Sequence, residues 1–479
     1  MRTHAKRGLW LAAVLGCAPA APPAGARSTL SSAHVPIVWR YDVRAGVDYL
    51  AIDAEFAAEG AIDLRVDDPA MPFVRDVEYA VALGNQAQWA PAPVRGTAWR
   101  VPCRPGACKV RYRFALHEAG TSLDDANTAS ASDDVVVAPP STWLLRPEPR
   151  QPPGLFRFHV STTPPTRFEA GTLPSPDGLP GTFEASTDAL DRSSFAMFGG
   201  FREEEIRSGA ARVIVGIVPG GLTLTNSEIA AWVRSAVDAI AVYLGRFNAE
   251  RTLIIVETGG RGPTRGETIG DGGPAVLLRV GEEVNAAKTA DDWVVTHELL
   301  HVNLPSLSFQ QRWLEEGLAT YVEPIVRARA GLVPVQKFWS DLVDGLPQGL
   351  PEAGDEGLDR THTWGRTYWG GALFCFVADV TIRERTHNAR SLDDALRAVV
   401  ATGANVSSQW TIEQFLEVGD RATETRVLHE LYARTALAPG SFDLAALWSR
   451  LGVRRTGGGV AFDETAPLAA IRRAITRAP

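Results

Sequence analysis

Two histidines and a glutamate form the pattern in this sequence with the clearest chemistry. His297 and His301 stand four residues apart, so on a helix both imidazoles project from one face, about one turn apart. Two neutral imidazole nitrogens in that arrangement can bind one Zn²⁺ ion. Glu298 lies beside them, where a carboxylate could take a proton from a metal-bound water. The sequence HELLH therefore predicts a metal centre that activates water.

A pair of adjacent acidic residues, Glu315 and Glu316 in WLEEGLATY, lies further along the chain in another helical pattern. One of the two could complete a site of two histidines and one glutamate, with the fourth position open to water. One helix step turns a side chain by about 100°, so only one of them can reach the metal. We expect helices over 291–302 and 311–329. The alternative is a pair of histidines that only pack or form hydrogen bonds, because such short motifs also arise by chance.

Length and charge limit the classes of function. A chain of 479 residues is expected to form two or three domains. Its 45% apolar and 22% charged residues are ordinary for a folded soluble protein. A net charge of −8, with no basic run, argues against nucleic acid or an anionic membrane surface as a partner.

Residues 1–26 have the pattern of a secretory signal: a basic start, a short apolar run and small residues in AAPPAGA. Two forms of processing stay open. Cleavage could fall near Ala24 or Ala26, or the segment VLGC could be a bacterial lipoprotein box that places a lipid anchor on Cys17. Both predict export to the periplasm, to the cell envelope or out of the cell. No other stretch is long and apolar enough to cross a membrane.

The patterns predict a multidomain chain. Short alternating strands separated by Gly, Pro and Asp indicate a β-sandwich-like N-terminal domain over 28–204. Strands then alternate with helices over 205–335, where the metal motif lies, and a capping-box sequence begins a helix at Thr225. From 336 to 479 the patterns are mainly helical.

The cysteines do not have the spacing of a zinc site. Cys103 and Cys108 bracket Arg-Pro-Gly-Ala, a turn sequence between two strand-like segments. In an oxidising compartment this predicts a disulfide at the tip of a hairpin. Cys375 lies in an apolar helical run and is expected to be buried.

A glycine-rich segment over 258–273 precedes the strand-like PAVLLRVG. It lacks the G-K-[ST] of a phosphate loop, and its glycines would allow a substrate backbone to approach closely. A strand beside the metal helix can also leave an edge to which an extended peptide adds. PAVLLRVG is the candidate edge, and we expect substrate contacts from Gly272, Gly273, Pro274 and Ala275.

The segments THELLH, WLEEGLATY and TYWGGALFCFVADVTIRERT resemble the gluzincin aminopeptidases. The resemblance is to the glycyl-aminopeptidase family, which is related to the membrane alanyl aminopeptidases. It covers most of the chain and is strongest over 293–385. It implies an N-terminal β domain, a thermolysin-like α/β zinc peptidase domain and helices that wall the cleft. It also implies one zinc ion per chain and a peptide substrate.

The resemblance assigns roles to single residues. It implies Glu298 as general base and three zinc ligands: His297, His301 and Glu316. Glu316 is preferred to Glu315 because it directly precedes Gly317, as in the family's pattern. Tyr368 would donate a hydrogen bond to the oxyanion, or else it is only a packed aromatic. His362 is a weaker candidate for the same role.

The sequence departs from the family at the substrate strand. That strand usually carries an acidic residue for the free amino group of the peptide, and here no acid precedes Glu282 in GGPAVLLRVG. Glu267 and Asp271 could substitute for it. Besides an aminopeptidase, three alternatives stay open: an endopeptidase, a zinc hydrolase of non-peptide amides or esters, and a catalytically idle peptide-binding protein.

Overall fold

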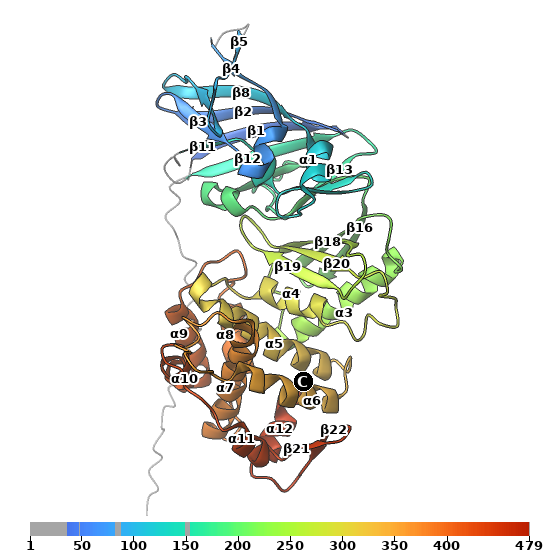
Figure 1. Cartoon of the computed structure of the whole chain (residues 1–479), viewed down its shortest axis with the longest axis vertical. Coiled ribbons are helices and arrows are strands. Elements are labelled where there is room, and N and C mark those ends of the chain that lie inside the picture. The colour runs from blue at the N-terminus through green and yellow to red at the C-terminus, as the bar shows by residue number, and fades with distance from the viewer. Residues whose placement is uncertain (1–35, 47, 82–87, 149–153, 479) are drawn as a thin grey trace, which may run out of the picture. The chain divides into compact units, whose positions relative to one another are not determined.

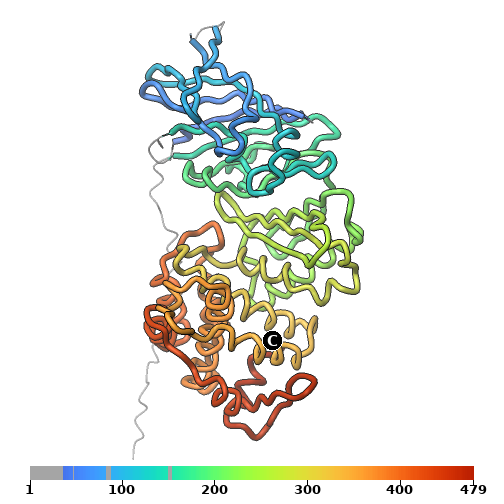
Figure 2. The backbone as a smooth tube through the Cα atoms, in the orientation of Figure 1, coloured from blue at the N-terminus to red at the C-terminus, as the bar shows by residue number. Residues whose placement is uncertain are grey.

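The computed structural model describes residues 36–46, 48–81, 88–148 and 154–478 (Figure 1). The predicted signal segment, with Cys17, lies outside the described residues. Along the chain, strands come first, a mixed α/β region follows and helices dominate the C-terminal part (Figure 2). This confirms the predicted order of elements. Among the described residues no helix is both long and apolar enough to span a bilayer.

Residues 37–199 form three sheets with alternating burial. In β1 (Ile37–Ala45), for example, Trp39, Tyr41 and Val43 are buried, whereas Arg40 and Asp42 between them are exposed. The seven-stranded sheet has the order β14 (Thr182–Ser186), β12 (Leu155–Thr162), β1, β2 (Leu50–Ala58), β8 (Gly106–Phe114), β4 (Val74–Ala80) and β5 (Trp89–Pro91). The first of two four-stranded sheets has the order β11 (Arg146–Glu148), β3 (Ile62–Arg65), β7 (Ala98–Val101) and β6 (Val94–Arg95). The second has the order β13 (Arg167–Ala170), β15 (Ala196–Gly199), β10 (Val135–Val137) and β9 (Ser130–Ser132).

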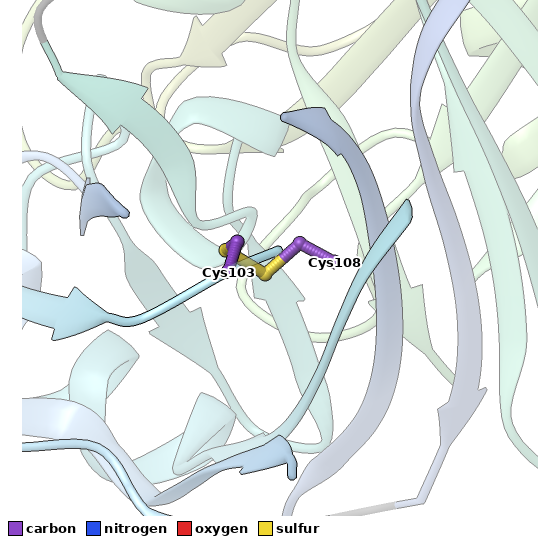
Figure 3. The surroundings of a disulfide bond; sticks show 2 residues. All are labelled: Cys103 and Cys108. Carbon is purple, nitrogen blue, oxygen red and sulfur yellow. A yellow bond between two sulfur atoms is a disulfide. The ribbon is translucent and has the colours of Figure 1, made fainter. Parts of the chain in front are cut away.

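Cys103 and Cys108 are joined by a disulfide (Figure 3). The prediction that it closes a hairpin is wrong. Strand β7, before the bridge, pairs with β3 and β6, whereas β8, after it, pairs with β2 and β4. The bridge therefore restrains a turn by which the chain passes from one sheet to another. Cys375 is a free thiol and is buried, as predicted.

A five-stranded sheet leads to the candidate site. Its order is β16 (Arg202–Ser208), β17 (Ala211–Ile217), β18 (Arg251–Thr258), β20 (Ala275–Val280) and β19 (Arg265–Ile269). The three inner strands are parallel and the two outer strands are antiparallel to their neighbours. Seven of the eight residues of β18 are buried, as expected for a strand covered on both faces.

The two faces of this sheet contact different parts of the chain. Val215 and Ile254 belong to the hydrophobic core formed with the helices, whereas Ile214 and Ile255 pack with residues of the N-terminal sheets such as Met197. Because side chains alternate along a strand, each of the three inner strands contributes to both cores.

Helix α3 (Asn226–Leu244) begins at the predicted capping box, in which Thr225 and Glu228 satisfy each other's backbone N–H groups. Helices α4 (Val294–Asn303) and α5 (Arg312–Arg329) follow the sheet (Figure 1). The later helices are α6 (Val335–Gly345), α7 (Gly371–Arg385), α8 (Leu392–Ala401), α9 (Ile412–Thr423), α10 (Val427–Thr435), α11 (Leu444–Leu451) and α12 (Ala469–Thr476). The remaining elements are α1 (Leu116–Leu123), α2 (Pro140–Trp143), the hairpin β21 (Val453–Thr456) and β22 (Gly459–Phe462), and short turns at 68–73, 187–192, 309–311, 346–349 and 366–370.

Candidate metal centre

Helix α4 carries the first two candidate ligands. It begins at Val294, rather than at Asp291, because the Asp292 carboxylate accepts a hydrogen bond from the Val294 N–H at 2.9 Å. From there one helical turn separates His297 from His301, and their Nε2 atoms lie 3.3 Å apart. The two side chains therefore point at a common position.

Helix α5 supplies a third candidate ligand at the same position. Glu316 Oε2 lies 3.3 Å from His297 Nε2 and 3.5 Å from His301 Nε2. Atoms bound to one tetrahedral zinc ion at about 2.0–2.1 Å would be about 3.3–3.4 Å apart, so these three atoms fit around one ion. Two imidazoles and one carboxylate are also a donor set that zinc accepts. Within the described part of the chain, these are the residues grouped closely enough to hold a metal.

The structure separates the two adjacent glutamates. Glu315 Oε1 accepts a hydrogen bond from the backbone N–H of Leu307 at 2.6 Å, so its side chain is directed to the loop between the two helices. Burial raises the pKa of Glu315, partly offset by that hydrogen bond. Glu316 alone faces the histidines, as its position before Gly317 predicts.

Charge concentrates where the three ligand atoms meet. Burial would raise the pKa of Glu316, but hydrogen bonds with His297 and His301 outweigh it and hold the pKa well below its usual range. Burial would lower the pKa of His301, but its hydrogen bond with Glu316 and the nearby carboxylates raise it to about 9. The carboxylates at this position thus favour the binding of a cation, either a metal ion or a proton.

Zinc binding is therefore expected to release a proton and to strengthen about tenfold per pH unit between about pH 6 and 8. His301 is protonated below a pKa of about 9, and zinc needs the neutral imidazole, so the affinity falls as the pH falls. Calorimetric titration in two buffers of different ionisation enthalpy measures the protons released. An affinity that does not change with pH, without proton release, would contradict this account.

Glu298 is held beside the ligands by the strand β19. The Thr268 hydroxyl donates to Glu298 Oε2 at 2.7 Å, and Glu298 is buried. A Cβ atom on Gly266 would lie 2.7 Å from Glu298 Oε1, so this approach of strand to carboxylate requires a glycine. Gly266 and Thr268 are two residues apart and face Glu298 together.

The prediction that PAVLLRVG forms the sheet edge is wrong. Strand β20, which that segment forms, pairs with β18 on one side and with β19 on the other, so its backbone groups are already used. The glycine-rich segment contains a strand that was not predicted, β19. Among the described residues β19 has no partner strand on its outer side, and it also packs against α4.

Of the four residues predicted to contact substrate, Gly272 is half-buried, and three are buried: Gly273, Pro274 and Ala275. The Gly272 carbonyl accepts a hydrogen bond from the Leu173 N–H at 3.0 Å, and a Cβ atom on Gly273 would collide with the Gly171 carbonyl. Ala275 lies within the ladder of β20. The glycines thus serve packing against the N-terminal sheets, and the segment that contacts Glu298 is β19.

Tyr368 lies in a π-helical turn, Arg366–Gly370, directly before α7. Such turns often occur at functional sites because they shift the direction of a side chain. Burial raises the pKa of Tyr368, and the nearby charges of Glu316 and Glu298 raise it further. The phenol therefore keeps its proton at neutral pH and can donate a hydrogen bond beside the metal ligand.

Two glycines join the elements that carry Glu316 and Tyr368. Gly317, on α5, lies against Gly371, the first residue of α7, and a Cβ atom on Gly371 would lie 2.8 Å from the Gly317 Cα. A Cβ atom on Gly317 would likewise collide with the backbone of Gly371. The two helices thus cross backbone to backbone beside the site.

Exposed aromatic side chains surround these residues. Trp293 contacts His297 with ring centroids 5.1 Å apart, and Trp364 contacts Tyr368 at 5.8 Å. Phe309 contacts His362, the weaker candidate, with ring centroids 5.4 Å apart. All three aromatic residues are at least half exposed. They give the surroundings of the site an apolar surface.

Sequence reasoning missed three residues of the site: Gly266, Thr268 and Arg312. The first two would follow from treating RGETI as a strand, since residues two apart share a face. Arg312 stands four residues before Glu316, which is one helical turn, and its guanidinium contacts the Glu316 carboxylate. The spacing of an arginine and a metal ligand on one helix face was the available signal.

Comparisons with known proteins agree with this architecture. The fold is similar to that of an aminopeptidase N family protein from Idiomarina loihiensis, with a TM-score of 0.64 and 13% identity over 87% of this chain and 78% of that one. An M1 zinc metallopeptidase from Deinococcus radiodurans matches with a TM-score of 0.48 and 15% identity over 83% of this chain and 92% of that one. No family model and no curated protein matches the sequence. The chain therefore shares the fold of an aminopeptidase N family protein, and the narrower glycyl-aminopeptidase resemblance stays a prediction.

Proposed function

We propose that the chain is a zinc-dependent metallopeptidase that acts as an aminopeptidase. The observation that carries the proposal is the convergence of His297 Nε2, His301 Nε2 and Glu316 Oε2 within 4.8 Å of one another. Glu298 and Tyr368, an acid–base group and a hydrogen-bond donor, adjoin this position. A fold similar to that of an aminopeptidase N family protein supports the same class of reaction.

Each side chain has a separate task in the proposed hydrolysis. Zinc, when bound, would polarise the peptide carbonyl and acidify a water. Glu298 takes the proton from the attacking water and later delivers it to the leaving amine. Thr268 keeps the Glu298 carboxylate in place through its 2.7 Å hydrogen bond. Tyr368 donates to the oxygen on which negative charge develops.

The strand β19 supports a peptide as substrate. Its outer edge offers backbone N–H and C=O groups, to which an extended chain can add as a further strand. The same strand holds Glu298, so a peptide on that edge would pass beside the acid–base group. The exposed rings of Trp293 and Trp364 would contact apolar side chains of such a peptide.

Glu267 supports the choice of an aminopeptidase. It lies on β19, it is exposed, and its carboxylate accepts a hydrogen bond from Asn127 at 3.2 Å. Because side chains alternate along a strand, its side chain lies on the face of β19 turned away from Glu298. We propose it as the acid that binds the free amino group of the substrate, which would then reach around the edge of β19. Asp271 is less suited, because it lies beyond the end of β19, where its backbone carbonyl accepts a hydrogen bond from the Ser194 N–H at 3.0 Å.

The Cys103–Cys108 disulfide supports the proposal that the chain is exported. Such bonds persist in oxidising compartments such as the periplasm or the cell exterior. This compartment agrees with the secretory pattern of residues 1–26.

A cleavage profile tests the function. Bound metal is measured first, and peptides with free and with blocked N-termini are then incubated with the zinc-loaded protein and with a chelated sample. We expect one zinc per chain and cleavage of free N-termini only, with the first residue released and no activity after chelation.

Other outcomes select the alternatives. Equal cleavage of blocked peptides would indicate an endopeptidase. Zinc binding without cleavage of any peptide would leave an amide or ester hydrolase or an idle peptide-binding protein, and it would overturn the proposal.

A further inference from the structure

Arg312 contacts the metal-ligand carboxylate from the side opposite the histidines. Its Nε and Nη2 atoms each lie 3.3 Å from Glu316 Oε1, while Glu316 Oε2 faces the histidines. The two oxygens of this carboxylate thus have different partners. A guanidinium fork suits this task, because two N–H groups on one oxygen restrain rotation of the carboxylate.

Helix stability does not account for this arginine. Arg312 is the first residue of α5, where a positive charge opposes the helix dipole. The order is also unfavourable, because an acid stabilises a helix better when it precedes the base by four residues. The exposed pair Glu417 and Arg421 on α9 has that better order. The position of Arg312 is therefore unfavourable for the helix both in its charge and in its order relative to Glu316. Residues that violate such local preferences are expected at functional sites.

The charge of Arg312 also acts on a residue of another element. It lowers the pKa of Tyr368, against the larger effect of burial, which raises it. Tyr368 belongs to the turn before α7, whereas Glu316 belongs to α5. About half of the Arg312 side chain remains exposed, so it reaches the site from solvent.

We propose that Arg312 is a positioning residue that orients the carboxylate of the metal ligand Glu316. This inference rests on the proposed function. Arg312 holds Glu316 Oε1 so that Oε2 alone is directed at the metal position. It contributes by orienting this carboxylate, and its guanidinium contacts Glu316 Oε1, the oxygen that faces away from the histidines.

Metal binding in the absence of substrate tests the inference. In Arg312→Met the zinc affinity, measured by competition with a chelator, is expected to fall by about 10–100-fold, as for loss of an outer-sphere partner. The visible absorption of the cobalt-substituted protein should change, because it reports ligand geometry. Arg312→Lys, which keeps one charge but not the fork, should restore the affinity in part. Arg421→Met removes a pair of the same kind on α9 and should match the wild type in affinity and spectrum.

Kinetics separates positioning from substrate binding. With zinc held saturating, Arg312→Met should lower kcat and leave KM nearly unchanged. A raised KM with unchanged kcat, zinc affinity and cobalt spectrum would assign Arg312 to substrate binding and overturn the inference. Wild-type zinc affinity and spectrum in Arg312→Met would also overturn it while the proposed function stands. A wild-type protein that binds no zinc would overturn both.

Discussion

Replacing Glu298 by glutamine is expected to lower kcat for peptide hydrolysis by about 10²–10⁴-fold while zinc stays bound. Glutamine has nearly the same shape, so Thr268 can still donate to it as it does to Glu298 Oε2. An amide cannot accept the proton of the attacking water or deliver it to the leaving amine. His297, His301 and Glu316 are untouched, and the metal content should therefore match the wild type.

The measurement pairs metal analysis with initial rates on one free peptide. Tyr368→Phe is the comparison variant, because it removes one hydrogen bond to the oxyanion and should lower kcat by about 10²–10³-fold. Near-full activity in Glu298→Gln would show that this carboxylate is not the general base. Loss of zinc from Glu298→Gln would instead indicate that Glu298 has a structural role in the metal centre.

Replacing Asp379 by alanine is expected to lower the free energy of unfolding by about 3–5 kcal/mol. Asp379 is buried on α7 and accepts hydrogen bonds from Arg383 at 2.9 Å, from the Tyr321 hydroxyl at 3.0 Å and from the Leu392 N–H at 3.0 Å. Removing it leaves the buried Arg383 guanidinium without its nearest counter-charge. Three helices, α5, α7 and α8, meet at this carboxylate.

Urea unfolding, monitored by tryptophan fluorescence and by far-UV circular dichroism, measures this change. Glu417→Ala is the matched control, because it breaks an exposed ion pair and should change stability by no more than about 0.5 kcal/mol. Equal stability of Asp379→Ala and the control would mean that the buried charges contribute nothing to the helical region.

Local patterns predicted much of this molecule. The HELLH helix and the capping box at Thr225 depend on spacings within a few residues, which already determine which side chains share a face. The choice of Glu316 over Glu315 came from the resemblance to the gluzincin aminopeptidases, in which the ligand directly precedes a glycine. The order of β, α/β and helical regions likewise follows from periodicity.

The errors concern relations between distant segments. Strand β19 is short and lies among glycines, so its sequence has a weak strand signal, and its pairing with β20 stabilises it. Because β19 pairs with β20, the last strand of the sheet is β19 and not the strand formed by PAVLLRVG. The bridge from Cys103 to Cys108 was placed in a hairpin because neighbouring strands usually pair, whereas these two belong to different sheets. The packing of Gly317 against Gly371 likewise joins residues that the fold alone brings together.

The close contact of Gly317 and Gly371 makes both positions sensitive to substitution, with effects on the kinetics of the protein. Neither residue has a side chain to contact a substrate or a metal. A single methyl group at either position would nevertheless push α5 and α7 apart and separate Glu316 from Tyr368. Such a variant could fold and hold zinc yet turn over slowly, and its kinetics would be hard to distinguish from loss of a catalytic group. Positions that determine catalytic distances in this chain thus include residues with no functional group at all.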